Sequence, residues 1–365
     1  MLVGVNCFRD AEICSMIESK KRLGICEITK EINIAVYDTE QDEYLQDYFS
    51  DILDVYTPVS GLPNDFPREY LRPLAETLKE NWTIFTVTPS EVQKIVIEIC
   101  KDSYEEDSDI FTQEVGIKEV CDSSFLRKKC LMKEFTWEQF KSSIKNINRF
   151  HSNHVNLELL QELFESKSMH TSYKASELTL YRGRISDEKG FEKSEMGPPP
   201  LQFVTAGRAN SAGIVCLYLA GDIETTFHEI RARDFDYISV GEFVLKKDIT
   251  IVDLSNLDNI SPFSTGNFDS VWFAINIKIL KQMSNEIAKP LRRQDSELDY
   301  LPAQYIADFV KSLGYDGIKF KSTLNPEGVN YAIFNHKKFK CQSVELYYIK
   351  SMIYDSEPQL IHRVC

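Results

Sequence analysis

The chain has 365 residues, with 56 acidic and 42 basic side chains and a formal net charge of −14 at pH 7. This length is enough for two domains with separate cores, and the 43% hydrophobic and 12% aromatic fractions exclude a mainly disordered chain. The net negative charge argues against nucleic acid as a partner, because such binding depends largely on Lys and Arg that neutralise phosphates. A few arginines in a pocket are still enough to hold a small phosphorylated ligand, since charges more than about 8 Å apart are largely screened.

No stretch of the sequence approaches the roughly 18 apolar residues of a membrane span. The longest apolar run, Gly213–Gly221, is half that length and predicts a buried strand. The segment Met1–Asp10 lacks the basic region and apolar core of a secretory signal. Nine cysteines, scattered from Cys7 to Cys365, are more typical of a reducing compartment than of a disulfide framework. We therefore expect a cytoplasmic protein with no membrane anchor.

Residues 1–165 are expected to form a mainly helical domain, or a helical domain with a small strand element. Thr136, followed three positions later by Gln139, is typical of the capping box that begins a helix. Apolar residues recur at helical spacing in three segments: Leu45–Tyr56, Val92–Ile99 and Trp137–Phe150. These patterns do not indicate what the domain binds.

Residues 166–365 are expected to form an α+β domain, because short strand-like runs alternate with a few helices. Helices are predicted at Glu224–Arg233 and Gln304–Leu313. The charged segment Ser186–Pro200 ends in three prolines, which predicts an irregular loop. Runs rich in β-branched and aromatic residues predict six strands: Leu178–Ile185, Ile214–Ala220, Tyr237–Leu245, Thr250–Leu254, Gly317–Lys321 and Tyr331–Phe334.

Three cysteines near the start of the chain raise the question of a zinc site. A structural zinc site normally contains close pairs such as Cys-x₂-Cys. Cys7 and Cys14 are seven positions apart, and no cysteine pairs with Cys26 at that spacing. We therefore predict no metal site.

Arg182 is the first candidate for a role in binding. Strand alternation over Leu178–Ile185 places it on one face with Leu178, Leu180 and Arg184, so its guanidinium lies at the lip of a core-facing surface. A buried guanidinium needs a partner. Its planar fork matches a phosphate, but an internal ion pair with Asp or Glu is an equally simple explanation.

Two more candidates lie in and after a glycine-flanked loop. The glycines of Gly207–Gly213 allow the backbone to approach a ligand closely and to present Arg208, although ordinary loops have the same composition. Tyr218 is the most polar side chain of the apolar run Ile214–Ala220. A buried tyrosine supplies a flat ring and a hydroxyl that needs a partner, in a core or in a binding site.

Glu229 and Ser322 complete the set of candidates. The spacing Thr226-x-x-Glu229 is that of a capping box, and the alternative is a carboxylate beside the strand of Tyr218, facing a sugar. Ser322 shares a strand face with Phe320, so its hydroxyl is expected to point toward the core. A strand-end serine that bonds to the backbone is the ordinary explanation for that position.

Together these segments resemble the RES domain family over roughly residues 175–345. Tyr218 follows Arg208 by ten positions and Glu229 follows Tyr218 by eleven, as the family pattern requires. Seven ordered stretches carry the resemblance: Leu180–Arg184, Gly207–Gly213, Leu217–Ala220, Glu224–Arg231, Tyr300–Ala307, Gly314–Gly317 and Lys321–Ser322.

The resemblance implies an α+β fold similar to ADP-ribosyltransferases, with NAD as the substrate and no required cofactor. Members of the family cleave the bond between nicotinamide and ribose, by hydrolysis or with inorganic phosphate as the acceptor. The implied catalytic residues are Arg208, Tyr218, Glu229 and Ser322, and the implied NAD-binding residues are Arg182, Arg208, Asn210 and Tyr218.

The resemblance also assigns a role to each group. Glu229 stabilises the positive charge that develops on the ribose, and Tyr218 stacks beside the nicotinamide. Arg208 and Arg182 hold the pyrophosphate, while Ser322 orients the ribose or Glu229. If the acceptor is phosphate, Arg208 is the candidate to bind it as well.

Further expectations concern biology and partners. The resemblance implies a toxin or defence effector, restrained by an antitoxin or another regulatory protein, and a homodimer. Two other functions remain open at this point. One is an ADP-ribosyltransferase that modifies a macromolecule, and the other is a non-catalytic protein that senses NAD through a degenerate site.

Overall fold

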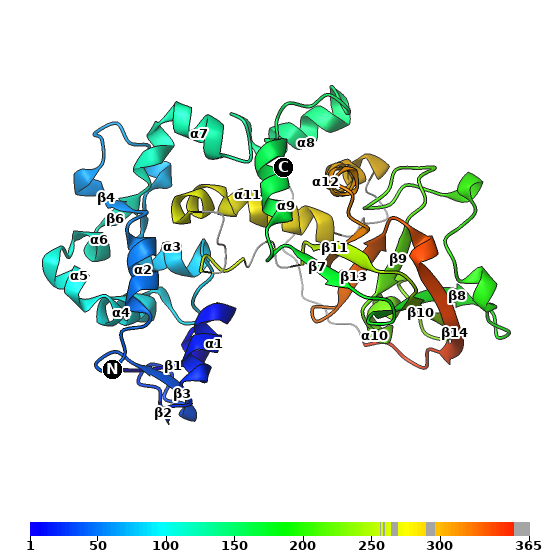
Figure 1. The fold of residues 1–365 in the computed structure, drawn as a ribbon, viewed down its shortest axis with the longest axis horizontal. Helices are drawn as coiled ribbons and strands as arrows, with labels where there is room; N and C mark the ends of the chain where they lie inside the picture. Colours follow the sequence, from blue (N-terminus) through cyan, green and yellow to red (C-terminus); the bar gives the residue numbers. More distant parts are fainter. Residues whose placement is uncertain (256, 258–259, 264–268, 290–295, 354–365) are drawn as a thin grey trace, which may run out of the picture. The chain divides into compact units, whose positions relative to one another are not determined.

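The computed structural model describes residues 1–255, 257, 260–263, 269–289 and 296–353 (Figure 1). It divides into two compact units. The N-terminal unit comprises Met1–His170 and Asn256–Ile287, and the C-terminal unit comprises Thr171–Ser255 and Ala288–Cys365. Helices dominate the first unit and a large sheet dominates the second, which confirms the predicted α+β class with a mainly helical N-terminal part.

The division between the units differs from the sequence-based boundary at residues 165 and 166 in two respects. The first stretch of the N-terminal unit runs to His170, and Asn256–Ile287, far along the chain, belongs to the same unit. Its helix α11 (Ser270–Ala288) carries Asn276, whose amide accepts a hydrogen bond from Leu131 N and donates one to Lys129 O, both at 2.8 Å. Local patterns cannot reveal such a pairing, because the partners lie about 145 positions apart.

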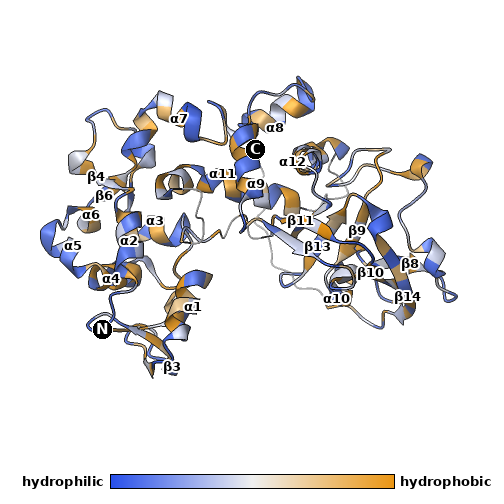
Figure 2. Cartoon of the chain, viewed as in Figure 1, coloured by the Kyte–Doolittle hydropathy of each residue, from blue (hydrophilic) through white to orange (hydrophobic). Residues whose placement is uncertain are grey.

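The N-terminal unit combines helices with two small sheets. β1 (Leu2–Gly4), β3 (Ile32–Asp38) and β2 (Leu23–Ile25) form one sheet, and β4 (Thr57–Pro58), β6 (Glu114–Gly116) and β5 (Arg72–Pro73) form the other. Its helices carry both hydrophobic and hydrophilic residues (Figure 2). Besides α11 they are α1 (Ala11–Ser19), α2 (Gln46–Leu53), α3 (Leu74–Glu80), α4 (Pro89–Ile99), α5 (Lys101–Glu106), α6 (Asp109–Thr112), α7 (Ser123–Lys129), α8 (Trp137–Asn146) and α9 (Leu157–Glu165).

The predicted start of α8 is confirmed, and its predicted end is wrong. Thr136 and Gln139 form the expected capping box. The helix ends at Asn146, however, so Ile147 and Phe150 are 81% and 84% exposed instead of continuing the buried face. The side chain of Asn148 accepts a hydrogen bond from His151 N at 3.1 Å, a local turn that replaces a further helical turn.

An eight-stranded sheet forms the centre of the C-terminal unit, in the order β14-β10-β8-β9-β13-β12-β11-β7. β11 and β12 run parallel, and β8, β9, β10, β13 and β14 pair with their neighbours antiparallel. The six predicted strands are present: β8 (Thr179–Ser186), β9 (Leu217–Ala220), β10 (Tyr237–Leu245), β11 (Ile249–Asp253), β12 (Gly317–Lys321) and β13 (Val329–Ile333). β7 (His170–Tyr173) and β14 (Phe339–Tyr348) were not predicted.

Helices cover this sheet where its apolar residues need burial. α10 (Ile223–Glu229) packs against β8 and β9, and α12 (Leu301–Ser312) packs against β12. The core beneath α10 includes Ile238 and Val240. The main core cluster contains Leu180, Met196, Leu217, Leu219, Phe243, Leu245, Ile249, Ile251, Tyr331, Ile333 and Phe339.

Strands β8 and β9 diverge soon after they meet. Among the described residues they pair at one position, Tyr181 with Ala220. β8 stays paired with β10 along most of its length, whereas β9 continues along β13. Since antiparallel pairing would otherwise have placed Gly183 opposite Tyr218, the divergence opens the sheet beside these two residues.

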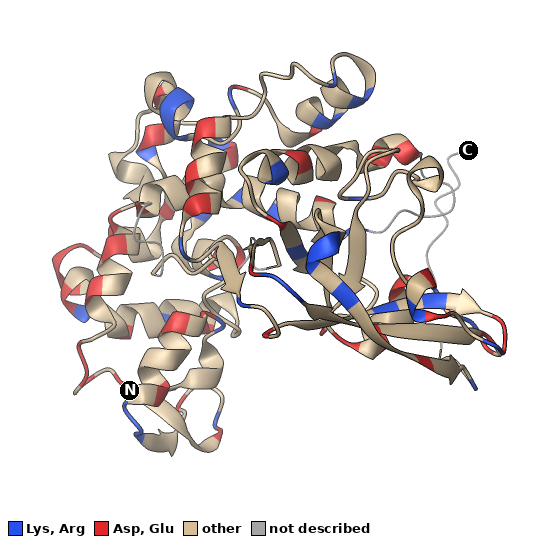
Figure 3. Cartoon of the chain, turned by 45° about the vertical axis from the view of Figure 1, so that its right-hand side comes forward, with Lys and Arg blue, Asp and Glu red and all other residues tan. Residues whose placement is uncertain are grey.

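Within the part of the chain that the structure describes, no helix has the length and apolar character needed to cross a bilayer. Acidic residues predominate among the charged positions of the N-terminal unit (Figure 3). This distribution supports the argument against nucleic acid as a partner, which remains a prediction.

Candidate functional site

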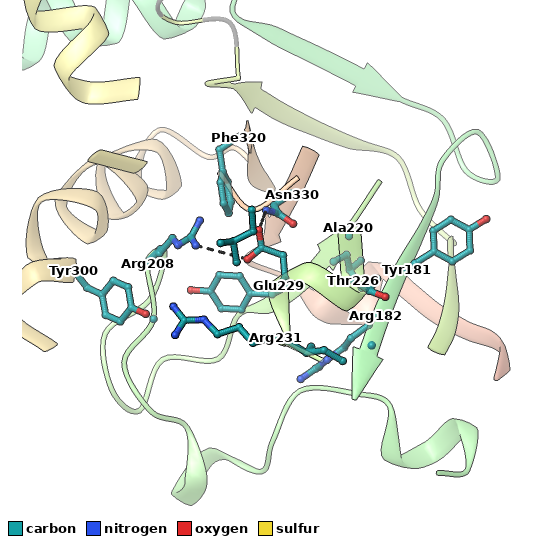
Figure 4. A pocket seen from close by; sticks show the side chains of 16 residues that line it. Tyr181, Arg182, Arg208, Ala220, Thr226, Glu229, Arg231, Tyr300, Phe320 and Asn330 are labelled. Atoms are coloured by element: carbon teal, nitrogen blue, oxygen red, sulfur yellow. Dashed lines mark hydrogen bonds and ion pairs between the residues drawn. The ribbon is translucent and has the colours of Figure 1, made fainter. Parts of the chain in front are cut away.

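A cavity of about 460 Å³ lies in the C-terminal unit where β8 and β9 diverge (Figure 4). Its volume falls within the range of roughly 300–1,000 Å³ typical of small-molecule sites. Its walls combine aromatic rings with charged and amide side chains. Among the residues that line it are Tyr181, Arg182, Arg208, Tyr218, Glu229, Arg231, Tyr300, Phe320 and Asn330.

Glu229, the last residue of α10, presents its carboxylate to this cavity. Its Oε1 atom accepts hydrogen bonds from Ser322 Oγ and Asn330 Nδ2, both at 2.7 Å. Its Oε2 atom lies 3.6 Å from Arg208 Nη2. The carboxylate is thus held in one orientation from three different segments.

The capping-box interpretation of Glu229 is wrong. Asp222, not Thr226, begins α10, because its carboxylate accepts a hydrogen bond from Thr225 N at 2.7 Å. The helix therefore starts several residues earlier than its spacing suggested, and Glu229 falls at its C-terminal end. The hydroxyl of Thr226 donates instead to Ile223 O at 2.7 Å. Glu229 is consequently left for the cavity.

Ser322 directly follows β12 and is buried, as strand alternation predicted. Its Oγ accepts hydrogen bonds from Leu324 N at 3.3 Å and Asn325 N at 3.1 Å. With its lone pairs used in this way, the hydroxyl proton is directed to Glu229. The Ser322 hydroxyl therefore donates to the Glu229 carboxylate. Bonding to the backbone, the ordinary explanation for a strand-end serine, accounts for only part of its hydrogen bonds.

Arg208 is a largely enclosed cation, with 11% of its side chain exposed. Its Nη2 faces Glu229, and its guanidinium carbon lies 5.5 Å from the centre of the Phe320 ring. Its Nη1 is buried and finds no hydrogen-bond acceptor among the described residues. Because an unpaired buried donor is costly, this atom indicates a place for an acceptor group of a ligand.

Tyr218 and Asn210 hold the loop that presents Arg208. The Tyr218 hydroxyl donates to Asn210 Oδ1 at 2.7 Å and accepts from Ala209 N at 2.9 Å. Burial raises the pKa of the Tyr218 phenol, so it stays protonated and remains a donor. Gln304 donates to Gly207 O at 2.8 Å and to Asn210 O at 2.9 Å, which fixes the loop from α12.

The proposed roles of Tyr218 and Asn210 change accordingly. The ring of Tyr218 lines the cavity, as expected for stacking, but its hydroxyl serves the loop. Asn210 is 3% exposed and donates to Thr205 O and Ser211 O. It therefore shapes the loop and is not among the described residues that line the cavity.

Gly207 is required by close packing. A Cβ atom at this position would lie 2.6 Å from Tyr218 Oη and 2.7 Å from Asn210 Oδ1. Both contacts are far below ordinary carbon–oxygen separations. The glycine thus allows the tyrosine to lie directly against the Arg208 loop.

Arg182 does not join the group around Glu229. It shares a face of β8 with Leu180, and its Nη1 donates to Met196 O at 3.4 Å. Burial, together with the nearby charge of Arg184, lowers the pKa of Arg182 to about 10. The internal partner is thus a carbonyl and not a carboxylate, and in Figure 4 the side chain points away from Glu229.

Two cavity residues were missed by sequence reasoning. Asn330 is an amide inside the apolar strand β13, and its burial at 6% exposed calls for a partner that proves to be Glu229. The predicted strand began one residue later, so this signal was excluded. Arg231 follows Glu229 by two positions and lines the same cavity.

The cysteines of the zinc question form a different arrangement in the N-terminal unit. Cys7 and Cys26 are fully buried with their sulfurs 3.6 Å apart, and we call them the sulfur pair. Cys26 Sγ accepts hydrogen bonds from Gly4 N at 3.2 Å and Thr29 N at 3.3 Å. The described residues contain no group of three or more His, Cys, Asp or Glu that could hold a metal ion. Metal analysis of purified protein tests that prediction.

Comparison with known proteins bears on the C-terminal unit. Residues 179–350 match the family model of the RES domain, which confirms the resemblance stated from the sequence. No curated protein matches the chain. One similar solved structure is a chain of the M. tuberculosis MbcT–MbcA toxin–antitoxin complex, at 11% identity, over 50% of this chain and 86% of that one, with a TM-score of 0.28. At that score the similarity carries no inference about this chain.

Proposed function

We propose that residues 179–350, which match the family model of the RES domain, make the protein an enzyme that cleaves the nicotinamide–ribose bond of NAD. The observation that carries the proposal is the Glu229 carboxylate, held by Ser322, Asn330 and Arg208 at the wall of the cavity. A negative charge fixed in this way suits a positive charge that develops on a sugar.

The chemistry assigned to Glu229 follows from the bond that breaks. The electron pair of the bond between ribose C1′ and nicotinamide passes to the ring nitrogen, which loses its positive charge as the base departs. Positive charge then builds on the ribose, as in glycoside hydrolysis. Because nicotinamide leaves as a neutral molecule, no general acid is needed for its departure.

The acceptor then attacks C1′ and completes the reaction. If it is water, the products are nicotinamide, ADP-ribose and one proton. If it is inorganic phosphate, a phosphate ester forms at C1′ in place of a hydroxyl. The buried Nη1 of Arg208 supports a role in holding a phosphoryl oxygen, of the substrate or of the acceptor.

Proton NMR of NAD mixed with the purified protein, with and without phosphate, tests the proposal. We expect proton signals of free nicotinamide to appear. A phosphorus NMR spectrum of the same sample should show a signal of a new ester only if phosphate is the acceptor. Activity in EDTA is expected to persist, since no cofactor is required. NAD that stays intact would overturn the proposal.

Label transfer in a cell extract, together with the release of nicotinamide, separates the two other functions. A macromolecular ADP-ribosyltransferase would transfer label from radioactive NAD to protein or nucleic acid in a cell extract. A non-catalytic sensor would bind NAD without releasing nicotinamide.

We also propose that NAD consumption makes the protein toxic to its own cell and that a regulatory partner restrains it. Expression of the wild-type chain is expected to stop growth and lower cellular NAD, whereas a Glu229→Gln variant should do neither. Growth that is unaffected at equal protein level would contradict this part of the proposal. The predicted homodimer is tested separately by light scattering of the purified protein.

A further inference from the structure

Arg231 occupies a position in the chain that normally belongs to glycine. It follows the end of α10, where Arg231 N donates to His228 O and Ala232 N donates to Phe227 O, both at 3.0 Å. This pair of bonds is the Schellman motif that closes a helix. The motif requires a left-handed backbone at Arg231, whose φ is 53°. Glycine adopts that conformation without the steric cost that a Cβ brings.

A non-glycine residue in this conformation costs stability, and such strain concentrates at functional sites. The geometry brings its side chain to the cavity that Glu229 lines, from the same turn of chain. In Figure 4 the side chain of Arg231 points to the side of the cavity where Arg208 and Tyr300 lie, whereas Arg182 points away from them.

The charges around the cavity favour an anionic ligand. Of the charged residues that line it, Arg208, Arg231 and Glu229 direct their side chains to the cavity, whereas the guanidinium of Arg182 points away from it. Arg208 lies beside that carboxylate, and Arg182 bonds to a backbone carbonyl on the other face of the sheet. A net positive lining in a chain of net charge −14 is a local arrangement that attracts anions.

We propose that Arg231 is the second arginine that holds the diphosphate of the substrate, together with Arg208, and that Arg182 is a structural residue of the sheet. This inference rests on the proposed function, because it assumes a dinucleotide in the cavity. The ribose that faces Glu229 is joined directly to the diphosphate in NAD. A guanidinium two residues beyond Glu229 can therefore contact the phosphates while the carboxylate faces the sugar.

The left-handed backbone of Arg231 is expected to allow removal of the side chain without loss of stability. Arg231→Gly removes the guanidinium and at the same time supplies the residue that the left-handed position favours. We expect the melting temperature to stay equal or rise, while the KM for NAD rises at least tenfold and kcat changes less. Arg231→Asn, which also tolerates this conformation, is expected to behave in the same way. Arg231→Lys should fall between them and the wild type, because it keeps the charge without the fork.

Arg233→Ala is the matched control. This arginine is exposed, lies two positions further along, and is not among the described residues that line the cavity. Its loss changes the net charge equally and should leave KM unchanged. The inference is overturned if Arg231→Gly keeps the wild-type KM, or if Arg182→Met raises KM more than Arg231→Gly does.

A binding measurement separates this inference from the proposed function. Calorimetry with inorganic pyrophosphate is expected to give a dissociation constant at least tenfold higher for Arg231→Gly than for the wild type. If the wild type fails to cleave NAD but shows that difference, the anion site stands and the enzyme proposal fails. If NAD is cleaved and the two proteins bind pyrophosphate equally, the anion site is rejected.

Discussion

Each unit of this protein buries a compact polar cluster, and the two clusters differ in which polar atoms lack a hydrogen-bond partner. In the N-terminal unit the sulfur pair, which we call the closed cluster, has its sulfur contacts filled: Cys26 accepts from Gly4 and Thr29 and contacts Cys7, and the buried atom left without a partner beside it is the uncharged Thr29 Oγ1. In the C-terminal unit Glu229 is equally well bonded, but its neighbour Arg208 retains one buried N–H group without an acceptor in the described chain. Arg208 itself is among the residues that line the cavity.

The difference separates a structural cluster from a binding site. Thr29 carries no charge and is not among the described residues that line the cavity, so the closed cluster has no cation for an anionic ligand. A cluster with a buried donor left over has a cost that a ligand can remove. Substitutions in the open cluster are therefore expected to change activity, and substitutions in the closed cluster to change stability.

The largest effect is expected from Glu229→Gln. This nearly isosteric change removes the charge that faces the ribose, so kcat for NAD should fall by about 100-fold to 1,000-fold. Circular dichroism should show an unchanged fold, since Ser322 and Asn330 still have an oxygen to donate to. Full activity in this variant would remove the open cluster from the chemistry.

Arg208→Ala is expected to lose at least tenfold in kcat/KM, or about 1.4 kcal/mol of transition-state binding. The reason is the loss of the guanidinium that we propose holds a phosphoryl oxygen. Steady-state kinetics with NAD measure the effect, and Arg208→Lys serves as the comparison that keeps the charge. Wild-type kinetics in both variants would show that the leftover donor has no ligand.

Ser322→Ala should have a smaller effect, about tenfold in kcat, or about 1.4 kcal/mol, with less change in KM. The hydroxyl contacts Glu229 and not the cavity wall, so its loss loosens the carboxylate without removing a substrate contact. A rise in KM alone would instead place Ser322 against the substrate. Ser322→Thr keeps a hydroxyl and is expected to recover part of the rate.

Cys26→Ala should leave the rate of NAD cleavage per folded molecule unchanged. It leaves the N–H groups of Gly4 and Thr29 without their acceptor, which should lower the free energy of unfolding by roughly 1–3 kcal/mol. Denaturant titration measures the loss, and the exposed Cys121→Ala is the control that should cost almost nothing. Unchanged stability together with reduced activity would contradict the claim that substitutions in the closed cluster change stability and not activity.

Sequence reasoning succeeded where the signal was local. Six of the eight strands of the sheet, the capping box at Thr136 and the inward position of Ser322 all follow from spacing within a few residues. The same reasoning left Glu229 undecided, because Thr226-x-x-Glu229 matches a capping box equally well and only Asp222 decides where the helix begins.

The other misses are consequences of pairing between distant segments. Asn330 meets Glu229 because β13 lies beside β9, a contact across about 100 positions. Arg182 lines the cavity, but strand alternation places its side chain on the face opposite Tyr218 once β8 and β9 are aligned, so its predicted contact with the pyrophosphate stays a prediction. Arg231 could have been found from its sequence position only with knowledge of where α10 ends.

A ligand in the cavity would lie where β8 and β9 separate, so its binding should stabilise both strands. Beyond the pair Tyr181 and Ala220, a molecule in the cavity would contact both of the strands that separate there. Saturation at 100 times the dissociation constant would stabilise the folded chain by about 2.7 kcal/mol. We therefore expect a bound dinucleotide to slow amide hydrogen–deuterium exchange along both strands for as long as it stays in the cavity.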